Sequence, residues 1–594
     1  MQGAERPDRP LLDAQALVGH LVAPGSMFAF LAAHRQDLFS DNEFEDLFPS
    51  GRGRPSIPAS VMASILVLQA LHDLSDRETA EAVRCDLRWK VATGMALDDT
   101  GFDPSTLVYW RKRLARSQRP QRINEAVRAV IAETAVVAGR GKRAVDSTIL
   151  ADAVATQDTI TQLISAVRRV GRIVPGGANA ITAVCTGHDY RGASKPVIDW
   201  DEPGAKDALV SALVNDANAV LAALAGIDED VAAQESVAAA SAMLALVAGQ
   251  DVEPAEGSDS TDGRWRIARK VAPDRVISQV DPEARHTRKS PEARRDGYRA
   301  HVVAEPETGI ITDEALTMAA GPVNSDAAVA EAFLTNDSTP GSEPRQWYGD
   351  SAYGTGDLRA AIRDAGHDAV IKPRPLTPAV AGGFTVDDFT VDQAGATVRC
   401  PAGHTRPITK ARNVVFGVVC RHCALREQCT TSKAGRTLTL HEHDDLLRAA
   451  RRDWATTPEL REHYRMNRPN VERVVSQIAT RGGRRLTLRY RGTVKNHAWL
   501  TRRTAGLQPA QPARPWPHLH RRNLGTGTTA SLTLGTTDCT ATNADTHPTR
   551  TPADRTPILF SRAPAITSAP GTALFSTLLG ESGHLPHLHG VDDA

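Results

Sequence analysis

The chain has 594 residues, a length at which we expect several domains rather than one hydrophobic core. Lys and Arg together number 70 and so do Asp and Glu, which gives a formal net charge of zero, and 41% of the residues are hydrophobic. No apolar run approaches a membrane span, no signal peptide is recognised, and the seven cysteines, mainly in one segment, do not form a secreted disulfide framework. We therefore exclude membrane and secreted classes and expect a cytoplasmic protein.

Charge is unevenly distributed along the chain. Between Arg481 and Arg503 eight residues are basic and none is acidic, and between Arg264 and Arg299 eleven are basic and five are acidic. Residues 199–262, by contrast, are acidic and rich in alanine. Basic segments of this kind are typical of a chain that binds phosphate with selected faces. For either segment alone, a solvated basic loop is an equal alternative.

The N-terminal part is predicted to be helical. Residues 1–25 are polar and contain proline, so we expect a flexible start, and a helical domain over residues 26–140. Apolar spacing predicts a helix over Ile57–Leu71, and Ser75–Glu78 has the spacing of a capping box that opens the next helix. A third, basic and aromatic helix is predicted to run to Leu114. This succession indicates a DNA-binding unit of the helix-turn-helix kind, with a plain helical bundle as the alternative.

An α/β domain is predicted over residues 141–505. It opens with a strand over Arg143–Leu150 that carries Asp146 in its middle. Residues 152–263 have alanine and valine at helical spacing and end in a Gly, Ser and Asp-rich linker, which predicts a helical insertion. A second insertion, over residues 373–440, contains four of the cysteines.

Further elements of this domain follow in chain order. Gly297–Val303 and Gly309–Thr317 are predicted to form a hairpin, and Ser325–Leu334 a helix. The apolar, aromatic run Gln346–Asp350 then predicts a strand that ends on a carboxylate, with glycine on both sides. Strand, hairpin, helix and strand is the order of a ribonuclease-H-like fold, which predicts that Asp146 and Asp350 lie next to each other in the sheet.

Three acidic residues are the candidate catalytic and metal-binding residues. Asp146 and Asp350 lie on the two strands, and Glu472 lies in an arginine-rich helix. Carboxylates from two strands and a helix can bind divalent metal for phosphodiester chemistry. Taken singly, each aspartate is more often a turn or helix-cap residue, and Glu472 is more often an ion-pair partner.

The helix that carries Glu472 contains a proline. Tyr464, Arg468 and Glu472 are spaced at i, i+4 and i+8. Because an interior proline costs a helix about 3 kcal/mol, we predict that the helix begins near Asn467, with Pro469 in its first turn. Tyr464 would then come from the preceding turn.

Several motifs together resemble those of the DDE transposases of bacterial insertion sequences, specifically the IS1182-like group within the IS4/IS5 assemblage. The resemblance covers roughly residues 25–505. Its stretches are the block that begins Gly51-Arg52-Gly53-Arg54-Pro55-Ser56, Val145–Thr148, Asp296–His301, Tyr348–Gly354, the cysteine segment and Tyr464–Lys495. It implies a ribonuclease-H-like catalytic domain, preceded by a helical domain that recognises DNA ends.

The resemblance also implies the chemistry and the partners. Asp146, Asp350 and Glu472 would bind Mg²⁺ or Mn²⁺ as two ions, one activating water and then a DNA 3′-hydroxyl, the other stabilising the leaving oxygen. Without a cation three clustered carboxylates repel one another, so we expect the free site to be poorly organised. The partners would be double-stranded DNA, as terminal inverted repeats and as target, and a second copy of the chain. Two other functions stay open: a metal-dependent nuclease of the same fold without strand transfer, and a non-catalytic DNA-binding protein.

Candidate DNA contacts follow from the same motifs. They are Arg468, Tyr464, Arg473, Lys289, Arg481 and Lys495. The family often has a lysine seven residues after the glutamate, where this chain has Ala479, so Arg473, Arg481 or Lys495 is expected to take its place. For His301 a contact to DNA phosphate and a packing role within the strand are equally open.

The cysteines predict a metal site. A Cys-x₂-Cys pair, a third cysteine six residues on and a fourth upstream fit a structural Zn²⁺ site, with reduced buried thiols as the alternative. The four are Cys400, Cys420, Cys423 and Cys429. His404 or His422 is a possible replacement for one ligand.

The last part of the chain differs in composition from the rest. Residues 506–594 are rich in Thr, Pro, Ala, Gly and His without periodicity, which predicts disorder. Back-translation of Gln508–Gly527 in a shifted frame restores a leucine-rich ending, so a frameshifted terminus is one hypothesis and a genuine extension is the other. A frameshift would remove the last helix of the catalytic domain and inactivate this copy.

Overall fold

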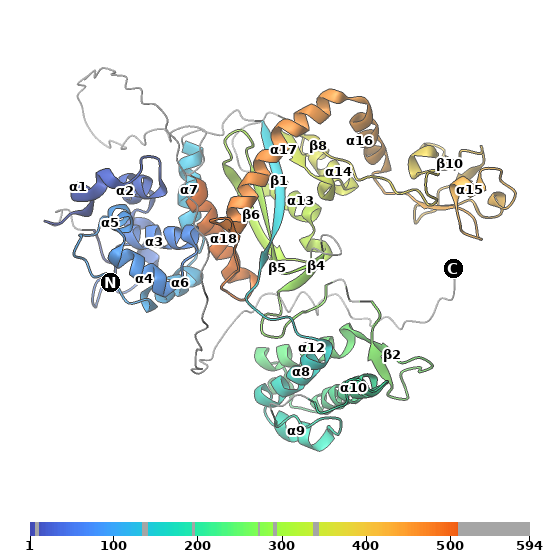
Figure 1. The fold of residues 1–594 in the computed structure, drawn as a ribbon, viewed down its shortest axis with the longest axis horizontal. Helices are drawn as coiled ribbons and strands as arrows, with labels where there is room; N and C mark the ends of the chain where they lie inside the picture. Colours follow the sequence, from blue (N-terminus) through green and yellow to red (C-terminus); the bar gives the residue numbers. More distant parts are fainter. Residues whose placement is uncertain are drawn as a thin grey trace, which may run out of the picture.

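The computed structural model describes eight stretches of the chain (Figure 1). Their bounds are 1–5, 11–133, 141–192, 196–270, 272, 274–288, 294–336 and 344–508. Within them an all-helical N-terminal region precedes a region built around a mixed sheet, so the architecture is mixed α/β. An inserted helical domain and a small unit that contains the four cysteines, here called the cysteine module, extend from the sheet region (Figure 1).

The N-terminal region packs around one central helix. Its helices are α1 (Ala14–Val18), α2 (Met27–Leu38), α3 (Ala59–His72), α4 (Asp76–Cys85), α5 (Leu87–Thr93), α6 (Ser105–Arg116) and α7 (Arg122–Glu133). Every residue of α3 from Ala59 to Ala70 is buried. A helix that is apolar all round needs partners on every side, and the other helices supply them around a common core.

The helices predicted for this region are present. The helix expected over Ile57–Leu71 is α3, and the basic, aromatic helix is α6. The capping box of α4 is formed in full: the Glu78 N–H donates to Ser75 Oγ at 3.3 Å, and the Ser75 N–H donates to the Glu78 carboxylate at 2.7 Å. The short helix α5 was not predicted, because seven residues are too few for a helical period to show.

The start of the chain is ordered where we expected flexibility. The Glu5 carboxylate accepts a hydrogen bond from Arg35 at 2.9 Å and another from Ser60. Asp13 caps α1 by accepting from the Gln15 N–H at 2.8 Å. The prediction for residues 1–25 is therefore wrong for the described part, since Glu5 is held by partners distant in sequence and Asp13 by a local helix cap.

The sheet region is built around β1 (Lys142–Ala151). On one side β1 pairs antiparallel with β5 (Arg294–Ala304), and on the other it pairs parallel with β7 (Gln346–Gly349), which pairs parallel with β8 (Asp368–Ile371). The far edge of β5 pairs with β4 (Arg285–Arg288) and β6 (Ile311–Met318), both antiparallel. The strand order β6-β5-β1-β7-β8 thus places the predicted Asp146 strand at the centre, beside the Asp350 strand.

Helices cover both faces of this sheet. On one face the long helix α17 (Pro458–Ala479) and α18 (Thr493–Leu507) pack against alternate sheet residues such as Ala144 and Tyr348. On the other face α13 (Asp326–Asn336) and α14 (Gly356–Asp364) pack against the intervening residues, such as Val145 and Trp347. Because strand side chains alternate between faces, Asp146 lies on the same face as Ala144. This is the face that α17 covers (Figure 1).

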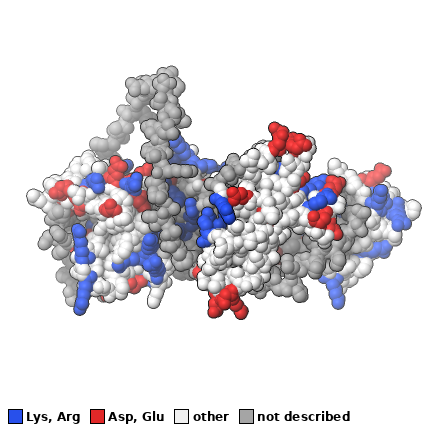
Figure 2. Space-filling view, turned by 90° about the horizontal axis from the view of Figure 1, so that it is seen from below, with Lys and Arg blue, Asp and Glu red and all other residues white. Residues whose placement is uncertain are grey.

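The inserted helical domain has a hydrophobic core of its own. Its helices are α8 (Thr159–Ile173), α9 (Gly177–Val184), α10 (Ala205–Leu224), α11 (Glu229–Ala232) and α12 (Glu235–Gln250). The Gly, Ser and Asp-rich stretch predicted to be a linker is instead the turn of a hairpin between β2 (Val252–Pro254) and β3 (Trp265–Ile267). Seen from below, this domain presents a largely uncharged face (Figure 2).

One helix of this domain corrects the expectation from hydropathy. Within the described residues α10 is long and apolar enough to cross a membrane by length and composition. Its apolar residues, among them Val210, Leu213 and Val214, are buried against α8 and α12 in the core of the domain. That burial is typical of the core helix of a globular domain.

The cysteine module is built from short elements. They are η5 (Val386–Asp388), β9 (Thr390–Asp392), β10 (Thr397–Arg399), β11 (Thr405–Pro407), β12 (Asn413–Val415), η6 (Gly417–Cys420), α15 (Arg426–Cys429) and β13 (Thr437–Thr439). A three-stranded sheet β11-β10-β9 and the pair β12-β13 enclose a small core. The helix α16 (Asp444–Thr456) then leads the chain back to α17.

The long helix α17 contradicts the predicted helix start at Asn467. It begins at Pro458, where a proline is tolerated in the first turn, and continues through Pro469. Asn467 lies inside the helix and its side-chain amide donates to the His463 carbonyl at 2.8 Å. Tyr464 therefore belongs to the same helix as Glu472, and its ring packs edge-on against Trp454. The packing of α17 along the sheet outweighs the local cost of the proline.

The final helix α18 runs beyond the predicted domain end at residue 505. It reaches Leu507, and Gln508 then pairs with the backbone of Ile311 by donating at 2.6 Å and accepting at 3.0 Å. Helix α18 therefore packs against β6 up to the last described residue. Residues 509–594, on which the predictions of disorder and of a frameshift fall, lie outside the described residues.

Candidate active site where the central strands meet helix α17

Asp146 and Asp350 lie level with each other on neighbouring strands. The last registered pair between β1 and β7 is Ala144 with Tyr348, and each aspartate follows two residues later on its own strand or just beyond its end. Asp350 also caps the turn after β7, because its Oδ1 accepts from the Ala352 N–H at 2.8 Å. Asp350 can therefore cap this turn through Oδ1 and still belong to the candidate site through Oδ2.

Helix α17 brings the third carboxylate and an arginine to the same place. Val471, Val474 and Ile478 bury one side of the helix against the sheet. Arg468 and Glu472, one turn apart, come from the part of α17 nearest the strand ends. This arrangement depends on packing between segments more than 100 residues apart, which spacing along the chain does not reveal.

Arg468 lies among all three carboxylates. Its Nη2 is 3.0 Å from Asp146 Oδ1 and 4.0 Å from Asp350 Oδ2, and its Nη1 is 3.6 Å from Glu472 Oε1. The side chain of Arg468 is only 4% exposed, whereas those of Asp350 and Glu472 are 47% and 63% exposed. The site therefore has a buried cation at its base and two carboxylates open to solvent.

The electrostatics of the site differ from our expectation. Burial raises the pKa of Asp146, while Arg468 and the Ser147 N–H lower it and Asp350 raises it further. We expected the carboxylates to repel one another into a poorly organised site, but Arg468 compensates their charge. The Arg468 guanidinium is buried, so its contacts with the carboxylates are not a simple surface ion pair.

The donor set suits a hard cation. Carboxylate oxygens are the ligands that Mg²⁺ and Mn²⁺ prefer, and Arg468 Nε and Nη1 have no hydrogen-bond partner within the described residues, although they are buried. No group of three or more His, Cys, Asp or Glu side chains in the described part of the chain has the spacing of a formed metal site. As placed, Arg468 occupies the space between the carboxylates, so metal binding requires the exposed Asp350 and Glu472 side chains to turn.

A supporting network behind Asp146 was not predicted. Ser147 Oγ donates to Asp326 at 2.6 Å, and Arg299 donates to the other oxygen of the same carboxylate at 3.0 Å. The Tyr353 hydroxyl is buried without a hydrogen-bond partner among the described residues. Burial first, then Asp326 and Asp146, raise the pKa of Tyr353 well above its usual range. Ser147, Arg299 and Tyr353 lie in the motifs of the resemblance, whereas Asp326 had no such signal in the sequence.

His301 has the packing role, not the DNA contact. Its side chain is fully buried, and its Nε2 lies 3.1 Å from Thr317 Oγ1 on the neighbouring strand. Burial, and next the charge of Arg299, lower the pKa of His301 from 6.5 to about 3. A buried neutral imidazole cannot reach DNA phosphate from this position.

The low pKa of His301 predicts a pH dependence of stability. Below pH 6.5 the unfolded chain binds a proton here, whereas the folded chain does so only near pH 3. As the pH is lowered from 6.5 to about 3, the free energy of unfolding should therefore fall by up to about 1.4 kcal/mol per pH unit. The free energy of unfolding, measured with urea at several pH values, should fall more steeply toward acid pH in the wild type than in His301→Asn. Amide exchange of β5 should show the same difference locally. Equal slopes would contradict the assignment.

The other predicted DNA contacts are scattered, except that Tyr464 lies near the carboxylates: burial first, then Asp350, Glu472 and Asp146, raise its pKa while Arg468 lowers it. Tyr464 is half-buried, and Arg473 and Lys495 are exposed. Arg481 is exposed too, but its guanidinium donates to the His72 carbonyl at the end of α3. Within the described residues none of these basic side chains forms an ion pair with the three carboxylates. Lys289 lies outside the described residues.

Part of the basic segment predicted to bind phosphate holds the protein together instead. Arg502 and Arg503 are 9% and 2% exposed, and Arg489 is paired with Asp73 at 3.6 Å. Ala479, where the family often has lysine, is itself buried at the end of α17. The replacement for that lysine among Arg473, Arg481 and Lys495 stays a prediction.

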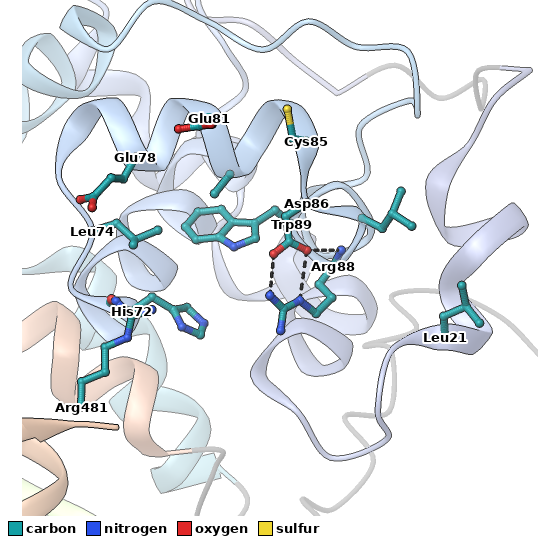
Figure 3. Close-up of a pocket in the computed structure, with 12 residues that line it drawn as sticks. Leu21, His72, Leu74, Glu78, Glu81, Cys85, Asp86, Arg88, Trp89 and Arg481 are labelled. Carbon is teal, nitrogen blue, oxygen red and sulfur yellow. Dashed lines mark hydrogen bonds and ion pairs between the residues drawn. The ribbon is translucent and has the colours of Figure 1, made fainter. Parts of the chain in front are cut away.

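An open cavity of about 730 Å³ lies between the N-terminal region and the hairpin of β14 (Thr480–Arg481) and β15 (Arg484–Arg485) (Figure 3). His72, Trp89 and Arg481 line it, and two of its charged groups, Arg88 and Asp86, form an ion pair at 2.6 Å. This cavity is a groove between two parts of the protein, distinct from the carboxylate site.

Comparison with known families finds two transposase domains in the chain. A family model described as a transposase domain (DUF772) matches residues 19–113, and one described as a transposase DDE domain matches residues 399–507. The second match includes Arg468 and Glu472 and the four cysteines. No curated protein and no solved structure matches the chain. The two matches support a DDE transposase of an insertion-sequence family, and the IS1182 group is consistent with them.

Proposed function

We propose that this chain cleaves DNA at the ends of an insertion sequence and joins those ends to target DNA, with Asp146, Asp350 and Glu472 as the catalytic and metal-binding residues. One observation carries the proposal: three carboxylates from segments far apart in sequence surround a single buried arginine, Arg468. The transposase DDE domain match, which includes two of these four residues, supports it.

We also propose a ribonuclease-H-like fold for the sheet region. The strand order β6-β5-β1-β7-β8 supports this, with β1 antiparallel to β5 and parallel to β7. In such a sheet the central strand and its parallel neighbour deliver side chains to a common end. Asp146 and Asp350 have those two positions.

Each side chain has a distinct part in the proposed reaction. Divalent Mg²⁺ or Mn²⁺, as two ions, would supply activation of the attacking oxygen and charge stabilisation at phosphorus. Asp146 is held in place by the Ser147 N–H and by Arg468. The exposed Asp350 and Glu472 face solvent, where DNA would arrive. Arg468, with two unsatisfied nitrogens, can accept the added negative charge of a phosphate.

The proposed partners follow from the reaction. They are double-stranded DNA, first as the terminal inverted repeats and then as the target, and a second copy of the chain in the DNA complex. The N-terminal helices α2–α6, which fall in the other transposase domain match, are the proposed DNA-end-binding unit. Such a reaction takes place in the bacterial cytoplasm.

Replacing Asp350 by Asn should abolish cleavage of DNA that carries the flanking ends of the gene, with Mg²⁺ or Mn²⁺ present. We expect a fall of at least about 10²-fold, because charge stabilisation at the reacting phosphate is lost. Asp364→Asn, at the exposed end of α14, is the matched control and should cleave normally. Gel assays of end cleavage and of joined products provide the measurement.

The outcomes separate the rival functions. Cleavage that depends on Asp350 and yields joined products supports transposition. Cleavage without joined products would indicate a nuclease of the same fold. Binding of the ends without cleavage by either protein would indicate a non-catalytic DNA-binding protein or an inactive copy, and would overturn the proposal.

A further inference from the structure

The cysteine module has a very small core for its size. Eight buried residues form it, namely Phe389, Val398, Val414, Phe416, Cys420, Cys429, Leu438 and Leu440. Its strands are three residues long. Units of fewer than about 70 residues seldom bury enough apolar surface to be stable, and usually need a disulfide or a metal. The described cysteines are all free thiols, which leaves a metal as the available cross-link.

The four cysteines of the module line one cavity of about 20 Å³. Cys400 comes from the turn after β10, and the other three come from the segment η6–α15, twenty residues further on. A cavity of this volume has room for about one small sphere, such as a water or a metal ion. Its other walls combine apolar side chains, such as Phe389 and Phe416, with the polar residues His404, Arg426, Thr430 and Arg436.

The backbone around the cavity is folded into tight turns that aim the thiols inward. In the first, the Cys400 N–H donates to the His404 carbonyl at 2.9 Å, and the Gly403 N–H donates to the Cys400 carbonyl at 2.8 Å. Gly403 has φ +87°, which a residue with a side chain rarely adopts. At the second turn the Arg436 N–H donates to Cys420 Sγ at 3.5 Å. Backbone donors to sulfur favour the thiolate form that binds metal.

Charge around the cavity also favours thiolates. Between Thr397 and Leu440 eight residues are basic and only Glu427 is acidic, and Lys and Arg predominate at this end of the molecule (Figure 2).

We infer that Cys400, Cys420, Cys423 and Cys429 bind one structural Zn²⁺ ion, which cross-links the two turns and completes the core of the module. Four thiolates fill a tetrahedral shell and leave no open position for catalysis. Since no three ligands in the described residues already have metal spacing, the sulfurs must close on the ion by side-chain rotation. His404 lines the same cavity but its side chain is exposed, and His422 does not line it.

The first test is the metal content of the full chain, purified without added chelator. We expect one zinc per chain by elemental analysis. Replacement by Co²⁺ should give the sulfur-to-cobalt charge-transfer band and the d–d bands of a tetrahedral thiolate site. A chain with no zinc that also fails to take up Zn²⁺ or Co²⁺ overturns the inference, as does stoichiometric iron in its place.

The second test uses thiol alkylation and a matched pair of variants. A strong chelator should expose four additional reactive cysteines in the wild type. Cys423→Ser should lower zinc content at least about tenfold, whereas Cys85→Ser, at an exposed cysteine outside the module, should leave it unchanged. Full zinc in Cys423→Ser overturns the assignment. Neither test measures DNA cleavage. The zinc inference can therefore be disproved while the proposed function stands, and the proposed function can be disproved while the zinc inference stands.

Discussion

Replacing Arg468 by Met should abolish DNA cleavage and destabilise the sheet region by about 3–5 kcal/mol, the usual cost of removing one partner of a buried ion pair. Arg468 is 4% exposed and is the only cation paired with the three carboxylates within the described residues. Without it Asp146, itself only 14% exposed, keeps a buried charge with no cationic partner, although the Ser147 N–H still donates to it. The carboxylates should then repel one another and leave the arrangement that the proposed reaction needs.

Arg468→Lys separates charge from geometry. A lysine keeps the positive charge but cannot reach three carboxylates with one planar group. We therefore expect Arg468→Lys to regain most of the lost stability and little of the cleavage activity. Arg465→Met is the control, because Arg465 is 70% exposed on the same helix and pairs only with Glu462 at 3.3 Å.

Thermal unfolding and the cleavage assay together measure these effects. Hydrogen exchange of β1 and α17 should locate the loss of stability at the site. Arg468→Met with cleavage within about threefold of the wild type would show that Arg468 has only a packing role, and the proposed site would need another cation.

Replacing Arg503 by Met should be as destabilising, also by about 3–5 kcal/mol, without touching the carboxylates. Arg503 is 2% exposed and lies between two helix ends. Its nitrogens donate to five backbone carbonyls at 2.8–2.9 Å, those of Ala70 and Leu71 in α3 and of Gln477, Ile478 and Thr480 at the end of α17. Burial lowers the pKa of Arg503 to about 10, so it remains charged at neutral pH.

A cation at the C-terminal end of a helix interacts favourably with the helix dipole. Arg503 does so for two helices at once, one in the N-terminal region and one in the sheet region. Its loss would leave several carbonyls without donors and would loosen the contact between α3 and α17. Hydrogen exchange should therefore increase at both helix ends in Arg503→Met.

Arg491→Met is the matched control, since Arg491 is an exposed residue of the same basic segment. If Arg503→Met left the exchange of the α3 end unchanged, the two regions would be joined by other contacts. DNA cleavage by this variant, once normalised to folded protein, should be reduced less than for Arg468→Met, because the carboxylate cluster is retained.

Local patterns were sufficient for many elements. The capping box of Ser75, the helix α3 and the strands that carry Asp146 and Asp350 could be predicted because each depends on a short run of side chains. Where a long-range contact outweighs a local preference, a prediction from the local sequence is wrong. Pro469 stays inside α17 because the sheet supports that helix on one side, and Glu5 is fixed by Arg35 and not left flexible.

The basic segment near the end of the chain shows the same limit. Eight positive charges without an acidic residue indicate phosphate binding on composition alone. In the tertiary structure Arg503 and Arg502 are buried, and Arg489 pairs with Asp73. Composition gives the number of basic residues in a segment. Whether each guanidinium binds a helix end or is exposed to solvent depends on the tertiary packing.

The sequence by itself determined the order of the elements, the identity of the three candidate carboxylates and the gathering of cysteines in one segment. These features are properties of short motifs and of composition. The tertiary structure alone decided that the carboxylates meet around Arg468, that Asp326 binds Ser147 and Arg299, and that Arg503 joins two regions. Those contacts link segments separated by up to 433 residues, and no local period or spacing records which distant groups a folded chain brings together.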